Sequence, residues 1–164
     1  MNQNEQAEQI RQRYASDPRS TSFNCVLYGG LGTGKTFSLR TAVAPVYVMS
    51  FDPGGSKVLA KAIAGSAYDQ SIEAGNILVG SRFEVEDPKR PGAFLLWDKT
   101  YEELKRSGFF DVIGTFVTDS MTTWAQCALN EVLKRAGRAG GVPQQNDWFP
   151  QMIMLENAIR DFIS

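Results

Sequence analysis

The sequence predicts an α/β protein, a three-layer sandwich built around a mainly parallel sheet. Short apolar runs of strand length alternate with longer segments of helical pattern. One of these runs, Val46–Phe51, is apolar apart from Ser50, as a parallel strand buried on both faces should be. The 164 residues suffice for one core. We therefore expect a polar N-terminal extension over residues 1–20 and a single domain over residues 21–164.

The expected elements alternate along the chain. Strands are expected at Phe23–Tyr28, Val46–Phe51, Asn76–Gly80 and Val112–Thr118. Helices are expected at Phe37–Val43, at Lys57–Ala64, from Trp97 or Asp98 to Arg106, at Met121–Ala136 and at Asp147–Ser164, with Asp147 as the N-cap of the last. Residues 82–91 read as a charged surface segment, and residues 137–146 as an irregular loop.

Composition narrows the chemistry. The net charge is −1 and no histidine is present, which excludes histidine-based acid–base catalysis and histidine-ligated metals. Cys25 falls in an expected strand and Cys127 in an expected helix, so both are predicted to be buried free thiols in a reducing compartment. No apolar run approaches the ~20 residues that span a bilayer. The composition predicts a cytoplasmic protein without a membrane role.

The run from Gly29 to Thr36 is a complete Walker A loop, with a strand expected before it and a helix after it. Its glycines let backbone N–H groups surround a phosphate. Lys35 then reaches the β- and γ-phosphates, and the Thr36 hydroxyl ligates Mg²⁺. The predicted nucleotide contacts are Gly29, Gly30, Leu31, Gly32, Thr33, Gly34, Lys35, Thr36 and Phe37. The motif predicts binding of a nucleoside triphosphate with Mg²⁺.

A second motif ends the strand that precedes Ser120. Thr115–Asp119 has the form of a Walker B strand, in which four apolar or β-branched residues lead to an aspartate. Beside the Walker A loop, Asp119 would hold Mg²⁺ through a water molecule, opposite Thr36. The alternative is that Asp119 only ends a strand and caps the following helix.

These motifs resemble those of the RecA-like branch of P-loop ATPases, and the layout is similar to small phage-encoded RecA-like proteins. The resemblance covers Phe23 to Ser164 and rests on the Gly-rich loop, on Phe51–Gly55 and on Phe116–Ser120. It implies an ATPase acting in phage DNA recombination or single-strand annealing, in the host cytoplasm.

The resemblance also implies a role for Asp52. In RecA-like enzymes, the strand after the P-loop helix ends near an acidic residue that polarises the attacking water. Asp52 is the acidic candidate, and it is shorter than the usual glutamate, so slow hydrolysis is expected. The alternative is a turn former, because Asp-Pro-Gly is itself a turn signal.

By the same resemblance, the loop over residues 137–146 stands where RecA-like proteins carry a DNA-binding loop. Lys134, Arg135 and Arg138 lie at its base and suit a phosphate backbone. Single-stranded DNA is thus an expected partner. RecA-like cores continue beyond the point where this chain stops, so it is either a fragment or a reduced sheet. A homo-oligomer is expected, because RecA-like sites are completed between subunits.

Two alternatives stay open. A small-molecule kinase would need a lid of arginines, but Arg82 and Arg90 alternate with acidic residues. A nucleotide-binding switch with slow hydrolysis would need no DNA. The guanine-specifying Asn-Lys-x-Asp string is absent, which favours ATP over GTP.

Overall fold

The computed structural model describes residues 23–30, 32–57 and 77–163. The chain divides into two compact units, Met1–Leu31 and Gly32–Ser164. In the first unit, the expected strand at Phe23–Tyr28 is wrong. Residues 23–30 form no strand, and the side chains of Phe23 and Tyr28 are almost fully exposed. Cys25 is exposed as well, contrary to expectation. An apolar run becomes a strand only where it finds a pairing partner, and here none is formed.

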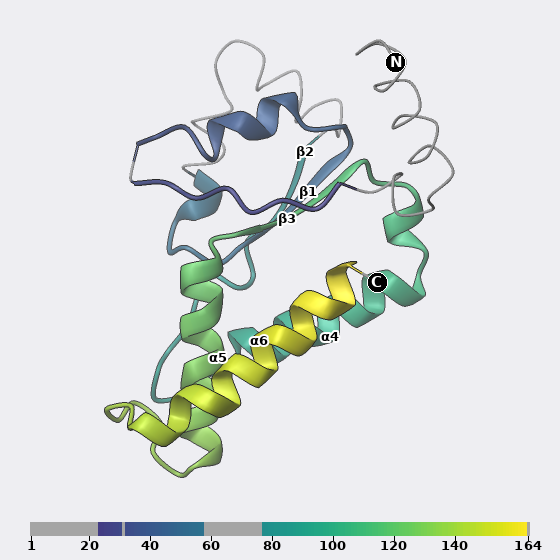
Figure 1. The fold of residues 1–164 in the computed structure, drawn as a ribbon. Helices are drawn as coiled ribbons and strands as arrows, with labels where there is room; N and C mark the ends of the chain where they lie inside the picture. The colour runs from purple at the N-terminus through teal and green to yellow at the C-terminus, as the bar shows by residue number, and fades with distance from the viewer. Residues whose placement is uncertain (1–22, 31, 58–76, 164) are drawn as a thin grey trace, which may run out of the picture. The chain divides into compact units, whose positions relative to one another are not determined.

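The second unit contains a parallel sheet of three strands in the order β2-β1-β3 (Figure 1). The strands are β1 (Val46–Ser50), β2 (Ile77–Gly80) and β3 (Thr115–Asp119). Val46 pairs with Ile77 on one side and with Thr115 on the other. This confirms the expected α/β class with parallel strands. β3 begins later than predicted, because Phe109–Asp111 form a 3-10 helix, η3, and Val112 ends it.

The two faces of the sheet bury different residues. Tyr47 and Met49 of β1 belong to the core shared with the long helices. Val46 and Val48 pack instead with Leu39. This alternation follows from the two-residue repeat of a strand. The sheet therefore carries apolar layers on both faces, which is compatible with a three-layer sandwich.

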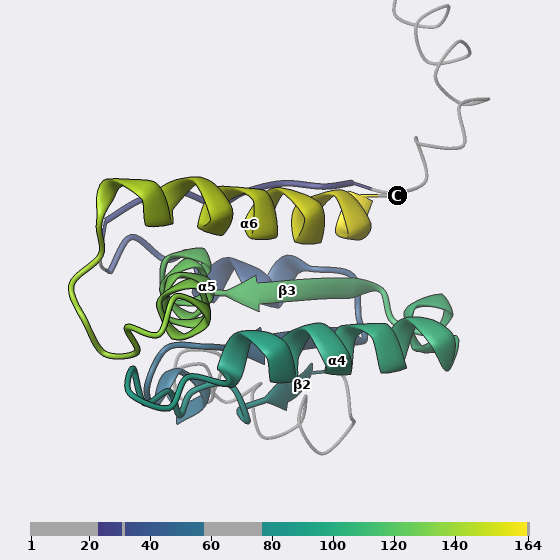
Figure 2. The same ribbon diagram turned by 90° about the horizontal axis from the view of Figure 1, so that it is seen from below.

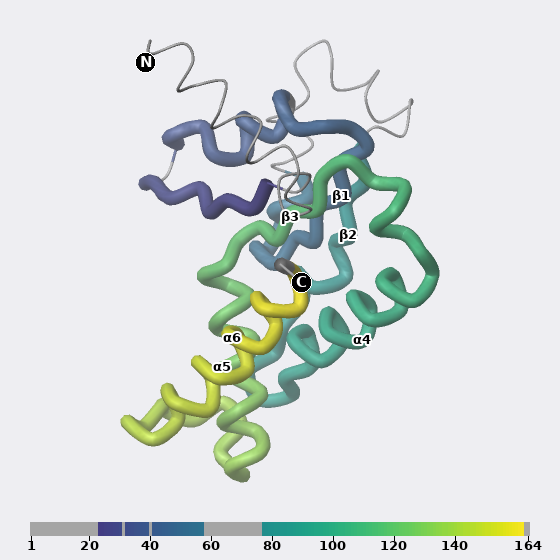
Figure 3. The backbone as a smooth tube through the Cα atoms, turned by 45° about the vertical axis from the view of Figure 1, so that its right-hand side comes forward, coloured from purple at the N-terminus to yellow at the C-terminus, as the bar shows by residue number. Residues whose placement is uncertain are grey.

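Three α-helices, α4 (Ala93–Arg106), α5 (Met121–Arg135) and α6 (Trp148–Ile163), lie on one side of the sheet (Figures 1 and 2). Figure 3 follows the chain from α5 into α6, and the two helices pack against each other. α4 begins several residues before the expected Trp97, because the Glu86 carboxylate accepts hydrogen bonds from the Gly92 and Ala93 N–H groups at its first turn.

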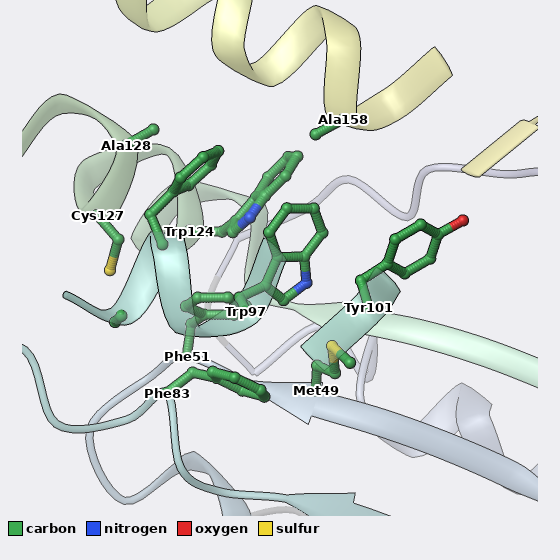
Figure 4. Close-up of a cluster of buried hydrophobic side chains, with 11 residues drawn as sticks. Met49, Phe51, Phe83, Trp97, Tyr101, Trp124, Cys127, Ala128 and Ala158 are labelled. Carbon is green, nitrogen blue, oxygen red and sulfur yellow. The ribbon is translucent and has the colours of Figure 1, made fainter. Parts of the chain in front are cut away.

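Aromatic side chains fill the core under these helices (Figure 4). The rings of Trp97 and Trp124 meet edge to face with centroids 5.0 Å apart, and Phe51 stacks on Phe83. Phe83 is fully buried, so the segment predicted as charged surface also supplies core. Cys127 is buried as expected, and burial raises the pKa of its thiol to about 12. This thiol is therefore a packing group rather than a nucleophile.

Two further expectations need correction. The helix predicted over Phe37–Val43 is a five-residue 3-10 helix, η2 (Phe37–Thr41), that ends before the cis bond to Pro45. Asp147 does not start α6. It ends the 3-10 helix η4 (Gln145–Asp147), where its carboxylate accepts from the Gln144 N–H. The helix predicted at Lys57–Ala64 lies almost entirely outside the described residues, although residues 55–57 are helical. None of the described helices is long and apolar enough to cross a membrane.

Gly114 provides a test of how β3 approaches β1. A Cβ atom built there would lie 2.5 Å from the Val43 carbonyl oxygen and 2.6 Å from that of Ala44. Because both neighbours are backbone atoms, Gly114→Ala should lower the free energy of unfolding by about 2 kcal/mol. Urea unfolding measures this loss.

The matched control is Gly92→Ala, at a position where a Cβ would meet nothing within 4 Å. This change should lower the free energy of unfolding by only about 0.5 kcal/mol, because alanine is less favourable than glycine as an N-cap. Equal losses at the two positions would contradict the close approach of β3 to the 43–44 backbone.

Candidate functional site

The site forms where β1 and β3 end. Ser50 pairs with Asp119 in the parallel register, and the Phe51 N–H donates to the Asp119 carbonyl oxygen at 2.7 Å. Asp52 follows Phe51, just beyond the end of β1. Because the carboxyl ends of adjacent parallel strands lie at one edge of a sheet, the two predicted acidic residues become neighbours.

Lys35 and Thr36 join this pair within the same unit. The Thr36 side chain and then the Lys35 ammonium lie close enough to the Asp119 carboxylate to favour its charged form. Gly32 and Gly34 precede them with φ angles of 74° and 87°, a backbone conformation suited to glycine. Residues 32–36 thus form a turn that brings a lysine and a threonine to the two aspartates.

Asp52 is fixed by hydroxyl groups from the start of α5. Its Oδ1 accepts a hydrogen bond from Ser120 at 2.8 Å and a shorter one from Thr123. Ser120 is also the N-cap of α5 and accepts from the Thr123 N–H. At the same time, the Asp52 carbonyl oxygen accepts from Gly55 N–H in a turn. Asp52 is therefore a turn former, and its carboxylate lies at the candidate site.

The two carboxylates repel each other. Burial, and then the neighbouring Asp52, raise the pKa of Asp119, although Thr36 and Lys35 act in the opposite direction. Two adjacent carboxylates beside a hydroxyl are oxygen ligands of the kind that Mg²⁺ prefers. Across the part of the chain that the structure describes, no group of three or more Asp, Glu or Cys side chains forms a metal site by itself.

The remaining predicted nucleotide contacts are divided between the two units. Gly29 and Gly30 belong to the first unit, and Leu31 lies outside the described residues. Thr33 and Phe37 are exposed in the second unit.

The predicted DNA-binding residues make ion pairs within the chain. Arg135 and Lys134 both pair with Glu131, and Lys134 also donates to the Pro91 carbonyl oxygen. Arg138 pairs with Asp147, which is almost fully buried. The Arg138 guanidinium and then the Gln144 N–H hold the pKa of Asp147 below its usual value. Arg138 therefore stabilises the loop, whereas the pairs of Lys134 and Arg135 with Glu131 lie within α5.

Arg82, considered above as part of a kinase lid, lies against aromatic side chains. Its guanidinium is 5.9 Å from the centre of the Phe83 ring and favours the charged form of Tyr47, whose pKa is nevertheless raised by burial. This arrangement gives Arg82 a packing role.

Sequence reasoning missed Thr123 and Glu84 as contributors to this edge of the sheet. Thr123 stands three residues after Ser120, the spacing of an N-cap pair, so a search for helix starts would have found it. Glu84 follows β2 and accepts hydrogen bonds from the turn after β1, a contact across about thirty residues that no local pattern reveals.

Comparisons with protein-family models, with curated proteins and with solved structures find no match. The chemistry of the site therefore has to be argued from its own residues.

The pKa of Asp119, raised by burial and then by Asp52, predicts how the free energy of unfolding depends on pH when metal and nucleotide are absent. A carboxyl whose pKa is raised by folding binds its proton more tightly in the folded state, so its contribution to stability falls as pH rises above about 4. Asp119→Asn removes this loss, so the variant should unfold at a higher temperature than the parent at pH 7. The difference should shrink as pH falls toward 4, measured by thermal unfolding in metal-free buffer.

Glu84→Gln should have the opposite effect on stability and lower the unfolding temperature at pH 7. Burial raises the pKa of Glu84, but the nearby Ser50 hydroxyl and the N–H donors of Ser56 and Gly54 outweigh it and lower the pKa overall. Its contribution to stability is therefore present at neutral pH and lost in acid. For Asp119, a lower stability of Asp119→Asn than of the parent at pH 7 would contradict a pKa raised by folding.

Proposed function

We propose that this protein binds ATP with Mg²⁺ and hydrolyses it slowly. The observation that carries the proposal is that Asp119 stands in register with Ser50 at the end of β1, with Thr36, Lys35 and Asp52 all close enough to shift the pKa of its carboxyl. A lysine and a threonine that follow a glycine-rich turn meet the aspartate at the end of a neighbouring strand. That arrangement joins the chemistry of the Walker A and Walker B motifs at one edge of the sheet.

Each side chain then has a distinct task. Lys35 supplies positive charge to the β- and γ-phosphates, and the backbone of residues 32–34 faces the phosphate chain. Thr36 and Asp119 would hold Mg²⁺, which when bound would neutralise phosphate charge. Binding of the cation would also relieve the Asp52–Asp119 repulsion, so the residues present suit a divalent ion.

Asp52 is proposed to orient the attacking water. Its Oδ1 already accepts from Ser120 and Thr123, so the carboxylate is well positioned, but part of its accepting capacity is used. Hydrolysis should therefore be slow. The order of motifs along the chain also supports our assignment to the RecA-like branch of P-loop ATPases.

Two biological roles fit this chemistry. One is a recombination or single-strand annealing factor that binds DNA as a homo-oligomer, and it rests on the resemblance of the motifs. The other is a nucleotide-dependent switch without DNA. The ion pairs of Lys134, Arg135 and Arg138 favour the switch, because a phosphate would have to displace Glu131 and Asp147 from the same cations.

Lys35→Ala tests the nucleotide site. Loss of charge-assisted hydrogen bonds to phosphate should weaken ATP·Mg²⁺ binding by about 2 kcal/mol, or about 30-fold, while the fold is retained. Isothermal calorimetry measures the affinity. Lys99→Ala, at an exposed position on α4, is the control and should bind like the parent. An unchanged affinity in Lys35→Ala would remove the proposed site.

The double variant Arg135→Ala, Arg138→Ala separates the two roles. If the loop binds single-stranded DNA, the slope of log affinity against log salt should flatten by up to about two units, with ATP affinity unchanged. Fluorescence anisotropy on the full chain with ATP present measures this slope. Absence of DNA binding by the parent protein at low salt would leave the nucleotide switch as the function.

A further inference from the structure

Glu84 makes a two-point contact with the turn that follows β1. Its Oε2 accepts from the Gly54 N–H at 3.1 Å, and its Oε1 accepts from the Ser56 N–H at 2.6 Å. Glu84 belongs to the segment that follows β2, so this contact ties the ends of two neighbouring strands together. Both carboxylate oxygens are used, and both donors are backbone groups.

The turn that Glu84 holds has little freedom. Gly54 has a φ of 75°, and the Gly55 N–H donates to the Asp52 carbonyl oxygen at 2.7 Å. A Cβ at Gly55 would lie 2.7 Å from the Ser50 Oγ and 3.2 Å from the Asp52 Cβ. Ser50 itself is fully buried. The backbone after β1 therefore passes directly against the base of Asp52.

Asp52 is thus constrained from two sides. Ser120 and Thr123 hold its carboxylate from the β3 side, while Glu84 holds its backbone turn from the β2 side. The first constraint sets where the carboxylate points. The second sets where the residue stands relative to the end of β3.

We propose that Glu84 is the positioning residue for Asp52, fixing the 52–56 turn so that the Asp52 carboxylate stays beside Asp119. This inference rests on the proposed function for its effect on hydrolysis. Glu84 is not itself the water-orienting group, because its two oxygens are occupied by the Gly54 and Ser56 N–H groups. Those bonds also keep it ionised, since they lower its pKa.

A double-mutant cycle on Glu84→Gln and Asp52→Asn tests this role. In Glu84→Gln, one amide end faces a backbone donor, so the turn loosens while the volume is kept. We expect kcat to fall about 10- to 100-fold with KM and ATP affinity little changed, since a small misplacement of a reacting group has effects of that order. In the Asp52→Asn background, the same change should have no further effect on kcat, because Glu84 acts only through Asp52.

Glu86→Gln is the matched control. Glu86 makes a similar two-point contact, from its Oε2 to the Gly92 and Ala93 N–H groups, but it holds the start of α4. It should lower stability comparably while leaving kcat at the parent value. If Glu84→Gln and Glu86→Gln change kcat alike, or if the Glu84 and Asp52 effects multiply, Glu84 is only a structural residue and the inference is overturned.

A second cycle on unfolding separates this inference from the proposed function. If the parent protein neither binds nor hydrolyses ATP, the proposed function fails, and urea midpoints still report on the turn. Coupling through the turn predicts that the midpoint shifts of Glu84→Gln and Asp52→Asn do not add, whereas those of Glu86→Gln and Asp52→Asn do. Additive shifts for Glu84 and Asp52 would show that Glu84 does not fix Asp52.

Discussion

Two carboxylates placed side by side at the ends of neighbouring strands are the constraint to which the rest of the site responds. Asp52 and Asp119 meet because β1 and β3 are parallel and in register, which is a property of the sheet and not of either residue. Like charges at this distance oppose folding. Every polar group around them reduces that cost, through hydroxyl donors on Asp52 and through Thr36 and Lys35 on Asp119. Such stored repulsion is typical of a functional site rather than of a structural one.

The parts of the fold that could be predicted depend on local pattern. β1 is an apolar run that ends at a turn signal, and α5 follows the strand that ends at Asp119, so both were expected at nearly their observed bounds. The N-cap of α5 is Ser120, however, and not Asp119. The Asp52–Asp119 pair follows from β1 and β3, because parallel strands bring their carboxyl ends together. The Walker A motif had also predicted that Thr36 lies opposite Asp119, and the two residues do lie close together. These elements could therefore be predicted, because each depends on residues that are close together in the sequence.

The parts that could not be predicted depend on partners distant in sequence. Phe23–Tyr28 has the composition of a strand but forms none in the described structure, since composition does not provide a pairing partner. Glu84 was read as one charge in a surface segment, although it holds a turn thirty residues earlier. Asp147 was read as a helix cap, and its partner Arg138 as a DNA contact, because each was considered without the other.

The pairing of Arg138 with Asp147 shows how burial changes the meaning of a charge. An exposed ion pair contributes at most about 1 kcal/mol, so an exposed arginine stays available to an outside phosphate. Asp147 is almost fully buried, and a buried carboxylate that loses its partner is strongly destabilising. If Arg138 turned outward, the loop would lose the ion pair that joins it to Asp147, just before α6. Glu131 is as buried as Asp147, but Arg135 and Lys134 share it, so one of these two more exposed cations can turn outward while the other still pairs with Glu131. A phosphate contact that also needs Arg138 would have to replace its ion pair with the buried Asp147.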